Sequence, residues 1–255
     1  MTDHVILIPG MMCSQQLWAK VEDPLRRHAR IHHAVLERNS IASIANNILA
    51  SAPPEFTIVG LSLGGIVAIH LAMLAPHRIT GMALLSTNAR APRPDQLRAW
   101  CESATRLDHG GSAVSEQRRL LEDLTSERSR TADPTLSARV LAMAEHIGTE
   151  GLRTQLAAQA SRIDYRDALR GVRCPSLVLA GEDDALCGVS TMREIAAHLP
   201  DSTFAIIPGS GHLIPMERPT DIVGLLAQWL ANITNSMPPE SAGATSSKLL
   251  SYSVP

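Results

Sequence analysis

A serine stands at the centre of residues 60–64 (GLSLG), which match the pattern G-x-S-x-G. These residues follow a short apolar run and open an apolar segment of helical length. A strand that turns this tightly into a helix holds its central residue in a strained conformation and exposes its side chain. The turn also aims the first amides of the helix at a point where a negatively charged oxygen would be stabilised. Ser62 is therefore a candidate nucleophile, although an ordinary glycine-rich turn would show the same pentapeptide.

A serine hydroxyl is a poor nucleophile unless a base within hydrogen-bond reach takes its proton. His212 is the best-placed histidine, because it ends a glycine-rich loop (GSGH, residues 209–212) directly after another apolar run. The two glycines allow this loop to fold close to Ser62. The chain has ten histidines, and the other nine lack this placement, so we expect them to serve the surface or the core.

An imidazole that accepts a proton needs a carboxylate to orient it and to stabilise its cation. The acidic residues Glu182, Asp183 and Asp184 follow a third apolar run, so the order along the chain is Ser62, acid, His212. A solvated turn would also be acidic, and the residues themselves do not select one carboxylate. A metal site is disfavoured, because no histidine pair and no H-E-x-x-H motif accompanies these carboxylates.

A further loop, residues 8–12 (IPGMM), follows the first apolar run of the chain. Its glycine allows a sharp turn, after which the amide of Met11 could face Ser62. Together with the amide of Leu63, it would form a two-donor oxyanion hole. The alternative interpretation is a simple turn between a strand and a helix.

Elements of two kinds must position these residues. Short apolar runs predict buried strands at His4–Pro9, Ala29–Leu36, Phe56–Gly60, Ile79–Thr87, Ser176–Gly181 and Thr203–Pro208. Helical patterns lie between them, at Trp18–His28, from the cap residue Ser40 to Ala50, at Gly65–Ala75 and from Pro219 onward. This alternation predicts an α/β fold, with a mainly parallel sheet of about six strands and helices on both faces.

Residues 88–170 break this rhythm, because they contain helical patterns and no good strand. The expected helices are Asp95–Leu107, Ser115–Arg128, Pro134–Ile147 and Glu150–Ile163. We expect an all-helical cap at 88–170, inserted into a core formed by residues 1–87 and 171–235. Residues 236–255 are rich in proline and serine and are expected to form a flexible tail.

Composition excludes several classes of function. The 255 residues are 45% hydrophobic and carry a net charge of −2, which argues against a nucleic-acid partner. No apolar run approaches the roughly 20 residues of a membrane span, and no signal sequence is visible, so we expect a cytoplasmic protein without a membrane partner. The four cysteines are widely spaced and are expected to be free thiols. Without G-x-G-x-x-G, a Walker loop or zinc-ligand spacing, no cofactor or metal is expected.

Three segments together resemble the α/β-hydrolase superfamily, in particular its small esterases and lactonases with a helical cap. They are GLSLGG (60–65), LVLAGEDD (177–184) and GSGHLIPMERP (209–219), and the resemblance extends over about residues 5–233 except for the insertion. It implies the α/β-hydrolase fold and a catalytic triad of Ser62, Asp184 and His212. The family spacing selects Asp184 over Asp183, and the implied oxyanion amides are those of Met11 and Leu63.

The chain departs from the family pattern in three places. Pro9-Gly10 stands where relatives often have His-Gly, which leaves Met12 as an alternative oxyanion donor. The common glycine-rich segment after the next strand is replaced by residues 36–40 (LERNS). The leading antiparallel strands are missing, so one sheet edge should be exposed, and a second copy in a homodimer could cover it.

The expected function is hydrolysis of a carboxylic ester through an acyl-enzyme on Ser62. Aliphatic candidates for the lining, such as Met11, Met12 and Leu213, favour a small, largely apolar ester or lactone. The same triad could instead cleave a lactone, a thioester or a carbon–carbon bond, or support a perhydrolase or haloperoxidase-like side activity. A non-hydrolytic ligand-binding or receptor protein is the alternative of another class.

Overall fold

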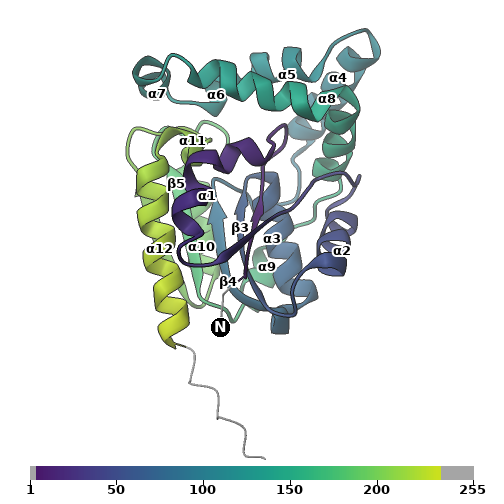
Figure 1. Ribbon diagram of the computed structural model, residues 1–255. Helices are drawn as coiled ribbons and strands as arrows, with labels where there is room; N and C mark the ends of the chain where they lie inside the picture. Colours follow the sequence, from purple (N-terminus) through teal and green to yellow (C-terminus); the bar gives the residue numbers. More distant parts are fainter. Residues whose placement is uncertain (1–3, 237–255) are drawn as a thin grey trace, which may run out of the picture.

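Six parallel strands form one sheet in the computed structural model, which describes residues 4–236 (Figure 1). Across the sheet the order is β2-β1-β3-β4-β5-β6, and every neighbouring pair is parallel. This confirms the predicted fold class. The strands are β1 His4–Ile8, β2 Arg30–His33, β3 Phe56–Leu61, β4 Ile79–Leu85, β5 Ser176–Gly181 and β6 Ser202–Ile207. Strands β3 and β5 are buried along their whole length, as their continuous apolar sequences require.

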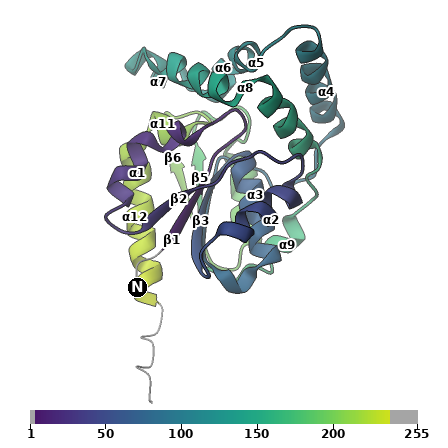
Figure 2. The same ribbon diagram turned by 45° about the vertical axis from the view of Figure 1, so that its right-hand side comes forward.

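Helices cover both faces of the sheet, as Figures 1 and 2 show from two directions. Successive side chains of a strand point to opposite faces. In β1, Val5 and Leu7 therefore join one apolar cluster, while Ile6 and Ile8 join the other. The first cluster packs under η1 Gln15–Trp18, α1 Ala19–Leu25, α11 Ile214–Glu217 and α12 Pro219–Ser236. The second packs under α2 Ile41–Ser51, α3 Leu63–Leu74, α9 Arg166–Leu169 and α10 Val189–His198, and the short η2 Pro76–Arg78 leads into β4.

Five helices form a layer above the carboxyl ends of the strands (Figures 1 and 2). They are α4 Pro94–Asp108, α5 Ala113–Arg119, α6 Leu121–Leu124, α7 Glu127–Ala132 and α8 Leu136–Ala160. We call this layer the cap helices. Helix α8 is interrupted at Gly148, where φ is 71° and ψ is 172°, which is the point between the two helices predicted from the sequence.

Two predicted helices are wrong in extent. Ser115–Arg128 is not one helix but parts of three, because Ser126 caps a new helix by accepting a hydrogen bond from the Ser129 amide at 3.1 Å. The predicted helix Trp18–His28 is instead the η1–α1 pair, since Ser14 already caps a 3-10 turn at Gln15.

Helices α9, α10 and α11 were not predicted. Most of the predicted tail, 237–255, lies outside the described residues, and α12 extends to Ser236.

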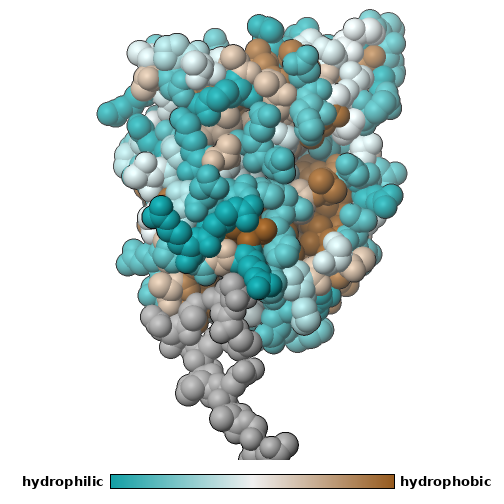
Figure 3. Space-filling model, viewed as in Figure 1, coloured by the Kyte–Doolittle hydropathy of each residue, from teal (hydrophilic) through white to brown (hydrophobic). Residues whose placement is uncertain are grey.

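The outer surface is mostly hydrophilic in the view of Figure 3, with an apolar area on the right below the cap helices. Both edge strands, β2 and β6, are partly exposed, whereas β3 and β5 in the interior of the sheet are fully buried. Among residues 4–236, no helix is both long enough and apolar enough to cross a membrane.

Candidate active site

Ser62 occupies the turn between β3 and α3 with φ 54° and ψ −117°, a conformation that non-glycine residues rarely adopt. Glycines make this turn possible. A Cβ on Gly60 would lie 2.4 Å from the carbonyl oxygen of Gly64, and a Cβ on Gly64 would lie 2.3 Å from that of Ile8. The backbone therefore passes closer than any side chain would allow, as predicted for a strained turn that presents its serine.

Strand β4 supports this turn from the neighbouring position in the sheet. The hydroxyl of Thr87 donates a 2.6 Å hydrogen bond to the carbonyl oxygen of Ser62, and the Ser62 amide donates to the carbonyl of Leu85 at 3.0 Å. Sequence reasoning missed Thr87. The available signal was its place just beyond the carboxyl end of the strand that pairs with β3.

His212 and Asp184 form a buried pair beside the turn. Nδ1 of His212 lies 3.0 Å from Oδ2 and 3.1 Å from Oδ1 of Asp184. The exposed fractions of the side chains are 3% for His212 and 0% for Asp184. Their loops follow the neighbouring strands β6 and β5, so the parallel sheet brings their carboxyl ends to the same edge.

The surroundings of Asp184 favour its ionised form. Oδ1 also accepts hydrogen bonds from the amides of Leu186 at 2.9 Å and Cys187 at 2.8 Å. Burial by itself raises the pKa of a carboxyl group. At Asp184 the charge and hydrogen bond of His212, together with the two amides, outweigh burial and hold the pKa below its ordinary value.

Asp183 and Glu182 face elsewhere. The side chain of Asp183 is exposed, and its amide donates to the carbonyl of Ser210 at 2.8 Å. Glu182 accepts a hydrogen bond from the Gly209 amide at 2.8 Å and so ties the histidine loop to the loop after β5. Of the three acidic residues, Asp184 is the one in contact with His212.

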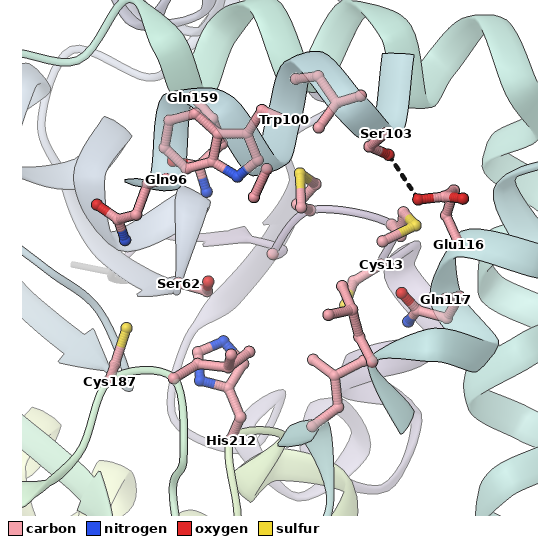
Figure 4. A pocket seen from close by; sticks show the side chains of 18 of the residues that line it. Cys13, Ser62, Gln96, Trp100, Ser103, Glu116, Gln117, Gln159, Cys187 and His212 are labelled. Carbon is pink, nitrogen blue, oxygen red and sulfur yellow. Dashed lines mark hydrogen bonds between the residues drawn. The ribbon is translucent and has the colours of Figure 1, made fainter. Parts of the chain in front are cut away.

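Ser62 and His212 line one pocket of about 390 Å³ between the strand ends and the cap helices (Figure 4). No hydrogen bond joins the two side chains among those of the described residues. Such contacts often tighten only when a substrate is bound. Met11, Met12 and Leu213 also line the pocket, as the sequence predicted, together with Leu152 and other aliphatic residues of the cap helices.

The loop after β1 lies against the turn that holds Ser62. The Cys13 amide donates to the Gly10 carbonyl at 3.2 Å, and this tight turn places Met12 at φ 56°. The Met12 amide donates to Oε1 of Gln155 at 2.8 Å, so this donor is already occupied. Met11 therefore remains the better candidate of the two for an oxyanion donor, alongside Leu63 in the first turn of α3, whose amide has no acceptor within the helix.

Two cysteines, Cys13 and Cys187, also line the pocket and are the rival nucleophiles. A cysteine attacks as its thiolate. Burial raises the pKa of the Cys13 thiol to about 12. Burial, and next the charge of Asp184, raises the pKa of Cys187. Both thiols are therefore protonated near neutral pH, which leaves the hydroxyl of Ser62 as the candidate that a base can activate.

One side of the pocket is more polar than the sequence suggested. Gln96 and Trp100 of α4, Gln159 of α8 and the buried Arg162 line it. These residues carry no local motif, so sequence reasoning had no means to find them. Among residues 4–236, no group of three or more His, Cys, Asp or Glu side chains is arranged to hold a metal ion.

Residues 39–219 match the model of a protein family described as the alpha/beta hydrolase fold. The chain is also similar to curated proteins along most of its length. A pimeloyl-(acyl-carrier protein) methyl ester esterase of Aromatoleum aromaticum is 27% identical over 241 residues, which cover 87% of this chain and 96% of that protein.

Solved structures share the fold. A thermophilic esterase from Thermogutta terrifontis superposes with a TM-score of 0.83 at 24% identity, covering 91% of this chain and 90% of that one. An enol-lactonase from Burkholderia xenovorans LB400 also gives a TM-score of 0.83, at 20% identity, with 91% and 92% of the two chains covered.

Proposed function

The chain belongs to the alpha/beta hydrolase family. We propose that it is a serine hydrolase that cleaves a carboxylic ester of a small, largely apolar substrate. One arrangement supports this activity above all. Ser62, held at a strained turn, shares a pocket with His212, whose far nitrogen contacts the buried carboxylate of Asp184. Nucleophile, base and orienting acid are the parts that acyl transfer requires.

The reaction proceeds through an acyl-enzyme. His212 takes the Ser62 proton as the oxygen of Ser62 attacks the ester carbonyl, and a tetrahedral oxyanion forms against the amides of Met11 and Leu63. Protonated His212 then gives its proton to the leaving alcohol. Water repeats the sequence on the acyl-enzyme and releases the acid, with Asp184 stabilising the imidazolium in both halves.

One of the similar proteins supports an ester as the bond that is cleaved. The relative from Aromatoleum aromaticum is named for hydrolysis of a methyl ester, and it matches this chain along nearly its whole length. The aliphatic lining from Met11, Met12 and Leu152 agrees with an acyl group that is largely apolar.

A fluorophosphonate probe tests the proposal directly, because it phosphonylates only a serine that is activated as a nucleophile. We expect stoichiometric labelling of the native protein on Ser62, found by mass spectrometry of the peptides, and none of the Ser62→Ala variant. Ser190→Ala, which removes an exposed hydroxyl on α10, is the matched control and should label normally. Native protein in which Ser62 stays unlabelled would refute the assignment.

A further inference from the structure

Arg162 is a buried cation in the wall of the pocket. It follows the end of α8, and only 6% of its surface is exposed. Its Nη1 donates to Oε1 of Gln159 at 3.0 Å and its Nη2 donates to Oε1 of Gln96 at 2.7 Å. The guanidinium lies over the ring of Trp100, with 5.1 Å between its central carbon and the ring centroid. Three neighbours thus fix the position and the plane of the group.

Within the part of the chain that the structure describes, no carboxylate pairs with this charge. The other arginines of the pocket lining have acidic partners: Arg93 contacts Asp95 at 2.9 Å, while Arg106 and Arg119 contact Glu116 at 2.6 Å and 3.7 Å. Among the ion pairs of residues 4–236, none includes Arg162. Burial lowers the pKa of its guanidinium, because a charge held away from water is disfavoured. An arginine nevertheless stays protonated in proteins.

The hydrogen bonds of Arg162 are incomplete as well. Its Nε is buried and has no acceptor among the residues that the structure describes. A guanidinium has five N–H donors, so two neutral amide oxygens leave most of its capacity unused. A buried donor without an acceptor and a buried charge without a counter-ion are both costly, and an anion bound in the pocket would remove both costs.

We propose that Arg162, oriented by Gln96, Gln159 and Trp100, binds a carboxylate at the end of the substrate away from the scissile ester. The substrate class is then a half-ester of a dicarboxylic acid, or a lactone that carries a carboxylate, with a largely apolar chain between the two groups. A planar guanidinium suits a carboxylate because both can share two parallel hydrogen bonds. Figure 4 shows Gln96, Gln159 and Trp100 together on one side of Ser62, with Gln117 and Glu116 on another.

The test by ester hydrolysis rests on the proposed function, whereas the test by ligand binding does not. Two probes of equal chain length, monomethyl adipate and dimethyl adipate, differ by one negative charge. We expect the wild-type protein to hydrolyse the half-ester with kcat/KM roughly 10- to 100-fold above that of the diester, as a charge-assisted hydrogen bond allows. Arg162→Gln should abolish this preference by slowing only the half-ester. Arg119→Gln, which alters a paired and exposed arginine of the same pocket, should keep it.

Several results would overturn the inference. If Arg162→Gln slows both esters equally, the arginine supports only the cap. If the wild-type protein prefers the diester, the pocket does not bind an anion.

A methyl phosphonoalkanoate of matched length tests the other source of negative charge, and a stronger preference for this phosphonate would refute the carboxylate. Arg162→Lys keeps a positive charge and should keep part of the preference, and thermal unfolding checks that each variant is folded.

Calorimetric binding to the Ser62→Ala variant separates this inference from the proposed function. Tighter binding of monomethyl adipate than of dimethyl adipate, lost when Arg162→Gln is added, supports the carboxylate site even if the wild-type protein hydrolyses neither ester. Hydrolysis of both esters at equal rates, with equal binding, would instead leave the proposed function standing and refute the carboxylate site.

Discussion

The backbone amide of Met12 in the loop after β1 donates its hydrogen to Oε1 of Gln155 in the cap helix α8, 2.8 Å away. Gln155 is 2% exposed, and it is separated from Met12 by 143 positions in the chain. Met12 needs such support, because its φ of 56° is unfavourable for a residue with a side chain. The bond links the cap to the loop that holds the candidate oxyanion donor, Met11.

Replacing Gln155 should therefore affect the chemistry through the loop. Gln155→Ala leaves the Met12 amide without an acceptor, and we expect kcat to fall on the order of 10- to 100-fold, since small misplacements near the reacting atoms are costly. KM should change little. Gln155→Glu keeps an acceptor oxygen at the same reach and should restore part of kcat. Equal loss in both variants, or a change in KM alone, would show that Gln155 only packs the cap.

Asp183 and Asp184 are adjacent in the chain and should behave very differently. Asp184→Asn removes the charge that orients His212, and the expected loss of kcat is about 10⁴-fold by analogy with other triads. Asp183→Asn changes an exposed side chain and is the matched control, with kcat expected to stay within about threefold. Ester hydrolysis by both purified variants, with circular dichroism to check folding, shows which of the two carboxylates acts on His212. A severe effect of Asp183→Asn alone would reverse the assignment.

The three catalytic candidates could be predicted from the sequence because each of them follows an apolar run. Ser62, Asp184 and His212 stand at the carboxyl ends of β3, β5 and β6, and in a parallel sheet these ends share one edge. Three local patterns therefore sufficed to place residues that are distant in sequence. The two helices predicted at Pro134–Ile147 and Glu150–Ile163 meet at Gly148, where α8 is interrupted.

The supporting residues could not be predicted, for a physical reason. Gln155 and Arg162 come from the cap, and their roles depend on which way α8 packs over the sheet rather than on any local pattern. Thr87 acts only because β4 pairs with β3. The helix boundary before Ser126 was also missed. A serine in a polar helical stretch is a weak sign of a helix N-terminus until the amide that it caps is known.

Thiol chemistry gives an independent test of the nucleophile. Of the four free cysteines, Cys101 is exposed, while burial raises the pKa of Cys13 to about 12 and that of Cys174 to about 11. Iodoacetamide at neutral pH should therefore modify Cys101 first and leave ester hydrolysis intact. Mass spectrometry of the labelled peptides and an activity assay on the same sample provide the readout, and unfolded protein should react at all four positions. Alkylation of Cys187 before Cys101 would contradict the buried, protonated state assigned to the Cys187 thiol.

Glu217 joins the histidine loop to the cap, and its removal should affect stability and catalysis together. One oxygen, Oε2, accepts hydrogen bonds of 2.9 Å from the Gly211 amide, the Ser126 amide and the Ser126 hydroxyl. Gly211 precedes His212, so these bonds help to fix the position of the proposed base. Glu217→Ala leaves three donors without this acceptor, and we expect the free energy of unfolding to fall by about 1–3 kcal/mol, with a lower kcat.

Glu217→Gln separates the contribution of the acceptor from that of the charge. Its amide oxygen can still accept these hydrogen bonds, although neutral acceptors are weaker than charged ones, so we expect a smaller loss of stability than in Glu217→Ala. Urea unfolding and ester hydrolysis would be measured on both variants and on the wild-type protein. If Glu217→Ala unfolds at the wild-type urea concentration, the three hydrogen bonds do not hold the cap to the histidine loop. If stability falls but kcat does not, the position of His212 is set by Asp184 and the Leu124 carbonyl, which accepts from the His212 amide at 3.1 Å.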